Sequence, residues 1–430
     1  MNKIFADTIQ TMASSALRSV LIAVTGIILA RSLQPQGQGT YAMVTTTALT
    51  AIAMGHLSLS KSQIAFWPDA ARRPSVTGNA LILGIVLGVF SALVTCGIVT
   101  AFVPLPAPDL LVIALIAVPL GVAATNLNGI LLLQSRTAVI NRAVVVSALV
   151  LHVPIVVLFF VGSLTTASAV VCWTISTATP FPLLIKALGP LKLRAELPLA
   201  CRQLALSGRY HIGPVALQLL IMANVLLLNT HVSAAEVGLY IVAMTVLTLA
   251  LIPADVVAQV ILSRQAGEEE HGARHITARA IRLNLLLSSV VVCAVVIVSP
   301  TLIPLVYGVA FTGSVSPLLC MAPGVIAFSL HRPVEQYLVR LGRPMTMAAI
   351  PVSALFVTLA LSIVMVPWWG AAGASLASSV SYIAMIVIEI RWYARVVRAG
   401  ARDLLPQASD LRSLWAAVRT RPSAASRRPR

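Results

Sequence analysis

One sequence pattern occurs twice in this chain. Residues 28–51 (ILARSLQPQGQGTYAMVTTTALTA) and residues 227–250 (LLNTHVSAAEVGLYIVAMTVLTLA) share the spacing of their Gly, Tyr and apolar residues, with Gly39 aligned to Gly238 and Tyr41 to Tyr240 at an offset of 240 − 41 = 199. A second match, VSAL at 146–149 and at 352–355, has an offset of 352 − 146 = 206. The two halves therefore read as copies of one unit, which is the usual organisation of a secondary transporter.

The composition places both copies in a membrane. Hydrophobic residues make up 58% of the 430 positions and charged residues only 10%, so a water-soluble core could not enclose the apolar surface. Stretches long enough to cross the roughly 30 Å hydrocarbon core as helices are expected at about 9–30, 40–62, 79–103, 109–133, 142–162, 166–188, 210–230, 237–262, 283–307, 313–335, 345–366 and 370–392.

The positive charge is distributed in a way that indicates orientation. The formal net charge is +17, but Lys and Arg gather in alternate connections between the predicted spans and in the tail, with Arg18 and Arg31 as exceptions. A nucleic-acid partner is not indicated by this pattern. The positive-inside rule makes the basic side cytoplasmic, so we expect a multi-pass protein of the bacterial cell membrane with both termini in the cytoplasm. The first span has no small-residue cleavage site and is expected to be retained.

These observations predict an all-α polytopic membrane protein with about twelve transmembrane helices. The helices are expected in two six-helix lobes, related by a pseudo-twofold axis normal to the membrane. The N-terminal lobe is predicted at 1–190 and the C-terminal lobe at 210–392, with a cytoplasmic linker at 191–209. A basic cytoplasmic tail follows at 393–430, and Leu411, Leu414, Trp415 and Val418 recur there at the spacing of a short amphipathic helix.

Signals of enzyme or metal chemistry are weak. No G-x-x-x-x-G-K-[ST] loop is present to bind a nucleotide. The five cysteines lack the spacing of a disulfide or metal framework, and the cluster from Glu268 to His271 is interpreted as a solvated loop. We therefore expect no catalytic residue, no metal and no cofactor.

Two segments resemble a known family. The segment GRPMTMAAIPVSALFVTLALSIVMVPWWGAAGASLASSVSYIAM at 342–385 is similar to the C-terminal signature of polysaccharide flippases, and ILARSLQPQGQGTYAMVTTTALT is similar to their N-terminal signature. The chain thus resembles the oligosaccharide-lipid branch of the multidrug/oligosaccharide-lipid/polysaccharide exporter superfamily. The resemblance implies two lobes around a central cavity that opens alternately to each side. It also implies a polyprenyl-diphosphate-linked oligosaccharide as substrate.

A basic residue within the first span is the main candidate for contact with such a substrate. A charge at bilayer depth costs at least a few kcal/mol, so Arg18 is either functional or an arginine that reaches up to lipid phosphate. Thr11 and Thr25 lie one heptad on either side of it, which gives the helix a polar stripe that should face a cavity. Arg18, Thr25 and Lys61 are the predicted cavity residues.

Two further pairs of ionisable residues are candidates. Subtracting the repeat offset from Asp255 gives His56, and equivalent positions should lie at equal depth. These two residues are predicted to act in coupling or gating, with independent satisfaction of each as the equally weighted alternative. In HRPVEQY, Arg332 and Glu335 are spaced for a structural ion pair at i, i+3.

Three functions are compatible with the sequence. The first is a flippase of lipid-linked oligosaccharides for surface polysaccharides such as lipopolysaccharide or exopolysaccharide, with a polysaccharide polymerase and glycosyltransferases as further partners. The second is a cation-coupled drug or metabolite exporter of the same superfamily, which the scarcity of acids in the spans disfavours. The third is a membrane glycosyltransferase or polymerase, which the short, nearly uncharged outer loops disfavour.

Overall fold

The computed structural model describes residues 2–103, 107–189, 194–256, 270–340, 344–397, 400 and 404–407, and the side chains of α1 from Leu17 onward except Arg18. No strand occurs among these residues. The helices, with two 3₁₀ turns, are α1 (Asn2–Gly55), α2 (Leu59–Phe66), η1 (Ala70–Arg72), α3 (Arg73–Phe102), α4 (Pro108–Leu115), α5 (Val118–Leu133), α6 (Thr137–Phe160), α7 (Thr166–Ala178), α8 (Pro180–Leu188), α9 (Leu197–His231), α10 (Ala234–Ala250), α12 (Glu270–Tyr307), η2 (Val309–Ser314), α13 (Val315–Phe328), α14 (His331–Arg340) and α15 (Pro344–Val397).

The described helices confirm the predicted polytopic architecture. Among the described residues, nine segments, each a single helix or several consecutive helices, are long and apolar enough to cross a membrane. Two of these nine, Ser19–Phe66 and Ala348–Val397, each contain two of the predicted spans, and the shorter apolar helix Ala234–Ala250 provides another. Over their described residues the twelve predicted spans are thereby helical apart from short turns, and residues 257–262 of the eighth span lie outside the described part of the chain.

Both of the long helices bend where the sequence requires it. In α1, Gln34 has φ 55° and ψ 173°. The following Pro35 has no N–H to continue the helix and disfavours helical ψ in the residue before it, which accounts for the break at this place. In α15, Gly370 has φ 51° and ψ −129°, a conformation that glycine adopts at little cost. Each bend joins two membrane-length segments, and both bends lie inside the two segments that carry the family resemblance.

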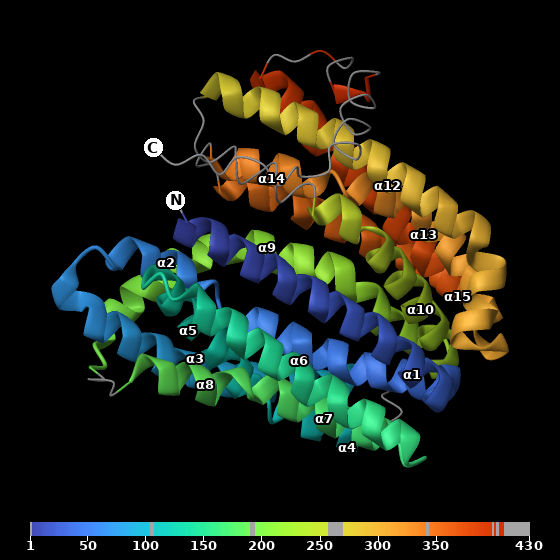
Figure 1. The fold of residues 1–430 in the computed structure, drawn as a ribbon, viewed down its shortest axis with the longest axis horizontal. Helices are drawn as coiled ribbons and strands as arrows, with labels where there is room; N and C mark the ends of the chain where they lie inside the picture. The colour runs from blue at the N-terminus through green and yellow to red at the C-terminus, as the bar shows by residue number, and fades with distance from the viewer. Residues whose placement is uncertain are drawn as a thin grey trace, which may run out of the picture.

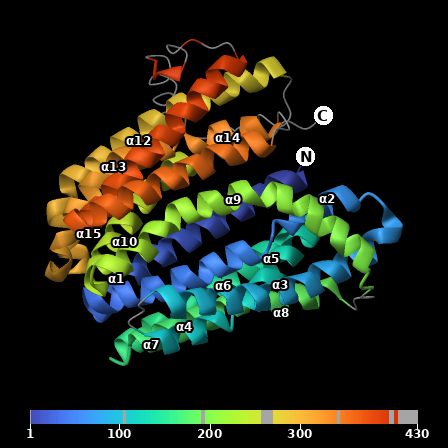
Figure 2. The same cartoon turned by 180° about the vertical axis from the view of Figure 1, so that it is seen from behind.

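The helices form two groups that meet at one end of the molecule (Figure 1). The group α1–α8 and the group α10–α15 lie close together where α1 bends, and they spread apart toward the end that carries α2 and α14, as the opposite view also shows (Figure 2). Helix α9 bridges the groups, because it packs on α2 and α3 as well as on α15. Since α9 begins at Leu197, residues 197–209 of the predicted linker are helix, with Pro198 in its first turn. The predicted tail helix at 411–418 lies outside the described residues.

Each group has its own buried core. In the first group, Val44 of α1 packs with Val118 and Val122 of α5 and with Trp173 of α7. In the second, a larger cluster gathers around Tyr240; it includes residues of α9, α10, α12, α13 and α15, and it extends to Ala30 and Met43 of α1 in the first group. Lipid tails are as apolar as these side chains, so close packing rather than escape from water holds the helices of each group together. The larger core therefore continues across the contact between α1 and α10.

Candidate functional site

The first contact between the groups is a crossing of α1 and α10 at two glycines. A Cβ on Gly39 would overlap the carbonyl oxygen of Ala234 and lie 2.9 Å from the backbone nitrogen of Gly238. A Cβ on Gly238 would in turn overlap the carbonyl oxygen of Pro35 and lie 3.2 Å from the nitrogen of Gly39. Only residues without a side chain permit this approach of two backbones. We call Pro35, Gly39, Ala234 and Gly238 the glycine crossing.

The crossing has the symmetry of the repeat. Pro35 and Ala234 are separated by the same offset, 234 − 35 = 199, as Gly39 and Gly238. Gly39 contacts Ala234, and Gly238 contacts Pro35, which is the residue equivalent to Ala234 under the repeat. Such a reciprocal contact is expected where a twofold axis passes between two equivalent elements. The pseudo-twofold axis that the repeat predicts therefore passes through the glycine crossing.

The second contact lies at a break between α1 and α2. Helix α1 ends at Gly55 and α2 begins at Leu59, and between them Leu57 and Ser58 have φ 44° and 50°. Left-handed backbone is costly for residues with a side chain. His56 compensates, because its Nδ1 accepts a hydrogen bond of 3.0 Å from the backbone N–H of Ser58.

A histidine from α9 closes this break from the other side. His211 Nε2 donates to the carbonyl oxygen of Met54 at 3.1 Å, and its Nδ1 lies 3.0 Å from Ser58 Oγ. The rings of His56 and His211 meet edge to face, with centroids 5.3 Å apart. We call Met54, His56, Ser58 and His211 the histidine seam. The seam satisfies backbone groups that a broken helix leaves free at membrane depth.

Neutral polar pairs extend the seam along α9. Ser207 Oγ donates to Ser62 Oγ at 2.9 Å, and both residues are fully buried. Further along, Asn79 Nδ2 donates to Gln203 Oε1 at 3.1 Å. Asn79 also exchanges two bonds of 3.1 Å with the backbone of Glu196. Helix α9 is therefore fastened to α2 and α3 by hydrogen bonds rather than by apolar packing alone.

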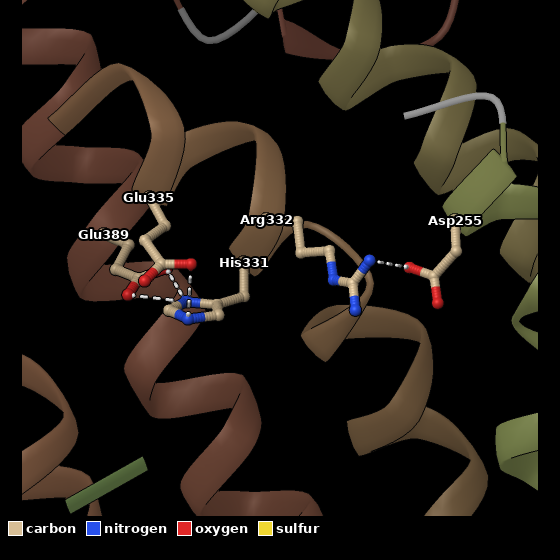
Figure 3. Close-up of polar contacts among 5 residues, drawn as sticks. All are labelled: Asp255, His331, Arg332, Glu335 and Glu389. Carbon is tan, nitrogen blue, oxygen red and sulfur yellow. Dashed lines mark hydrogen bonds and ion pairs between the residues drawn. The ribbon is translucent and has the colours of Figure 1, made fainter. Parts of the chain in front are cut away.

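A third set of polar contacts lies inside the α10–α15 group of helices (Figure 3). His331 Nδ1 is 3.0 Å from both carboxylate oxygens of Glu389, and the two residues are buried at 5% and 2% exposure. His331 Nε2 faces Glu335 Oε2 at 3.6 Å, and the Phe328 ring stacks on the imidazole. We call His331, Glu335 and Glu389 the carboxylate–histidine cluster. Because a carboxylate buried to this extent needs a compensating partner, His331 is the group that stabilises Glu389.

The ion pair predicted between Arg332 and Glu335 is wrong. Arg332 extends away from the cluster, and its Nη1 lies 3.7 Å from Asp255 Oδ1, while Glu335 faces His331 at i, i+4 (Figure 3). The reason is that α14 begins at His331, so residues 331 and 335 share the buried face and Arg332 points toward the end of the segment that follows α10. Arg332 and Asp255 are both partly exposed, so this contact is a weak surface pair.

The structure does not bring together the predicted gating residues. His56 has His211 as its ring neighbour, and Asp255 has Arg332. His56 and Asp255 are thus equivalent under the repeat, but they have no partner in common among the described contacts.

The predicted cavity residues have different outcomes. The side chain of Arg18 lies outside the described part of the chain. Thr25 is 3% exposed, and its Oγ1 lies 2.7 Å from His152 Nδ1 of α6, so in this conformation it is a buried contact within the first group, and its role in a cavity stays a prediction. Lys61 is exposed on α2, and its role stays a prediction.

Two residues of these sites were missed from the sequence. His211 lies in an apolar span like His56, and a rare ionisable residue in such a span is itself a signal. Glu389 carries the same signal in the last predicted span, 370–392. Neither stands at a repeat-equivalent position of another ionisable residue, so the offset that selected Asp255 could not select them.

Comparisons with known proteins identify the fold. No family model matches the chain, and no curated protein matches it in sequence. Among solved structures, it is similar to the lipid II flippase MurJ in an inward closed conformation, with a TM-score of 0.74, 13% identity, and coverage of 95% of this chain and 92% of that one.

Two structures of multidrug resistance MATE family transporters of the MOP superfamily are also similar. The inward-facing one has a TM-score of 0.70 and 14% identity, covering 89% of this chain and 94% of that chain. The outward-facing one has a TM-score of 0.62 and 14% identity, covering 91% and 94%. These relatives are a flippase and transporters rather than enzymes. The chain therefore has the fold of the MOP-superfamily transporters, with two lobes of membrane-spanning helices.

Proposed function

We propose that this protein moves an anionic, lipid-linked saccharide from the cytoplasmic to the outer leaflet of a bacterial cell membrane, by alternating access between its two lobes. The substrate class is a polyprenyl-diphosphate-linked oligosaccharide used in surface polysaccharide assembly. Both termini are cytoplasmic in this proposal. Reporters fused after residues 75 and 200 should accordingly report cytoplasm, and those near residues 164 and 233 the outer side.

The charge of the first lobe carries this proposal. Between residues 19 and 188 the only acids are Asp69 and Asp109, and both lie at or beyond helix ends. The same stretch contains seven bases: Arg31, Lys61, Arg72, Arg73, Arg136, Arg142 and Lys186. A lobe with bases and almost no acids suits an anion and gives a cationic drug no counter-charge. The likeness in fold to a lipid II flippase supports the same substrate class.

The membrane potential favours the proposed direction. With the cytoplasm electrically negative, outward movement of an anion gains roughly 2.3 kcal/mol per charge per 100 mV. A diphosphate group would thus contribute a driving force of its own. The TM-score is higher against the inward-facing MATE transporter than against the outward-facing one, which supports the inference that the structure represents a state near the start of this movement.

The test is a binding and flipping measurement with purified protein in liposomes. We expect saturable binding of an undecaprenyl-diphosphate glycan and none of an organic cation. Arg18→Ala should remove most of the flipping while leaving the protein in the membrane, and Arg18→Lys should keep part of it, because a point charge still meets a phosphate. Leu17→Ala, one residue away, is the matched control. Wild-type flipping by Arg18→Ala at normal abundance would return Arg18 to a lipid-facing role.

A cation-coupled exporter is the second candidate, and the carboxylate–histidine cluster favours it. His331, Glu335 and Glu389 provide a buried group that can exchange a proton, and relatives with this fold include multidrug transporters. The same liposome measurement separates the two candidates. Binding of the organic cation, with none of the glycan, would replace the flippase by the exporter.

A further inference from the structure

The histidine seam has hydrogen bonds whose directions are fixed by chemistry. The backbone N–H of Ser58 can only donate, so the Nδ1 of His56 that receives it at 3.0 Å carries no proton. The carbonyl oxygen of Met54 can only accept, so the Nε2 of His211 that contacts it at 3.1 Å carries one. The observed geometry is therefore that of a neutral His56.

The two histidines respond differently to a second proton. On His211 the free Nδ1 faces the hydroxyl of Ser58 at 3.0 Å, and a hydroxyl rotates to accept as readily as to donate. A proton on His211 is thus accommodated without loss of a bond. On His56 a proton at Nδ1 would turn this nitrogen into a donor that faces the Ser58 N–H, which is also a donor, and the hydrogen bond between them would be lost.

The surroundings of His56 leave His211 as its titratable neighbour. His211 of α9 faces it ring to ring, while Lys61 of α2 and Arg209 of α9 are exposed. From the sides of α3 and α5, Ser91 and Val122 contact Gly55, the residue before His56, and neither titrates. No carboxylate is described beside the imidazole to stabilise its charged form, and the second charge would stand next to His211.

We propose that the histidine seam is a proton-operated contact between the first lobe and α9, with His56 Nδ1 as the atom that takes up the proton. The incoming proton binds the nitrogen lone pair, and the only bond lost is the hydrogen bond from the Ser58 N–H. That bond holds Leu57 and Ser58 in left-handed backbone, so its loss frees the break between α1 and α2 to relax. Helix α2 then separates from α9 at Ser62 and Ser207.

This inference differs from the pairing of His56 with Asp255 expected from the repeat, because the responding partner is His211. It concerns movement of the lobes and is independent of which substrate is carried. Its test uses no transport assay, so its failure and the failure of the proposed function are distinguishable.

Cysteine cross-linking in the full-length protein tests the proposal. Ser62→Cys with Ser207→Cys replaces two hydroxyls that are 2.9 Å apart across the seam, in a background without the five native cysteines. Thiol oxidation itself depends on pH, so a control pair is needed. Ser147→Cys with Ser176→Cys provides it, because these hydroxyls are 3.1 Å apart between α6 and α7 inside the first lobe.

We expect the seam yield, divided by the control yield, to fall by about threefold or more between about pH 8 and about pH 4, a range wide enough to include a histidine whose charged form has no described counter-charge. His56→Asn should abolish this fall, because an Asn side-chain oxygen accepts the N–H two residues on and does not titrate. Ser58→Ala should keep the fall, since it retains the backbone N–H and removes only the hydroxyl that faces His211.

Three results would overturn the proposal: a normalised yield that is flat with pH in the parent, an equal fall in His56→Asn, or a flat profile in Ser58→Ala. Retained cross-linking of the control pair shows that the first lobe of each variant is folded. If His56→Asn fails that check, the parent profile and Ser58→Ala still decide the outcome.

Discussion

The glycine crossing and the histidine seam both join the two lobes, but they do so by different physics. At the crossing, backbone touches backbone and no titratable group takes part. At the seam, imidazoles and hydroxyls satisfy a broken helix through hydrogen bonds. The crossing therefore depends on shape alone, whereas the seam depends on protonation. In the proposed alternating-access cycle, two such contacts allow the pH to change one and leave the other unaffected.

The largest effect is expected from added volume at the crossing. Gly39→Leu places a side chain where even a Cβ overlaps the backbone of Ala234, and backbone cannot yield as a flexible side chain can. Overpacking costs about 1–3 kcal/mol or more, so we expect transport in liposomes to fall by more than about tenfold at every pH. Gly97→Leu in α3, where a Cβ meets nothing within 4 Å, should transport normally. Equal loss in both variants would contradict a specific role for the crossing.

A change inside one lobe should affect stability without affecting the glycine crossing or the histidine seam. Glu389→Gln removes the charge buried against His331, and an imperfectly satisfied buried group costs about 1–3 kcal/mol. We expect a lower midpoint of thermal unfolding in detergent and an unchanged pH profile of seam cross-linking. The control is Asp255→Asn, whose partly exposed pair with Arg332 is worth about 0–1 kcal/mol. An equally low midpoint in Asp255→Asn would mean that the buried carboxylate–histidine cluster contributes no more to stability than the partly exposed pair.

The smallest expected effect concerns which residues are coupled. His56 and Asp255 have separate partners, so His56→Asn and Asp255→Asn should change stability additively, to within about 0.5 kcal/mol. His56→Asn and His211→Asn touch one network and should deviate from additivity by more than that. The measurement is a pair of double-mutant cycles on thermal unfolding. Coupling between residues 56 and 255 of the larger size would restore the gating pair expected from the repeat.

Much of the fold was predictable because its signals are local or periodic. The apolar spans follow from composition, and Pro35 indicates the bend at Gln34. The repeat aligned Gly39 with Gly238, yet it could not show that the two touch, because equivalence under an axis gives no distance from that axis. The sites were less predictable for the same reason. Partner choice at His56, Arg332 and Glu389 depends on how the helices pack. The i, i+3 spacing of Arg332 and Glu335 does not decide their partners, because Arg332 meets Asp255 from another segment and Glu335 meets His331 of its own helix.

We expect the histidine seam to open as the pH falls while the glycine crossing stays closed. Spin labels at Gln36 and Val309, both exposed near the end where α1 bends, report on the crossing side, and labels at Lys61 and the exposed Cys201 report on the seam. When the pH falls from about 8 to about 4, the distance across the seam, measured by pulsed dipolar spectroscopy in lipid, should lengthen, while the distance across the crossing stays constant. Two distances that lengthen together, or a seam distance that stays constant, would contradict the account.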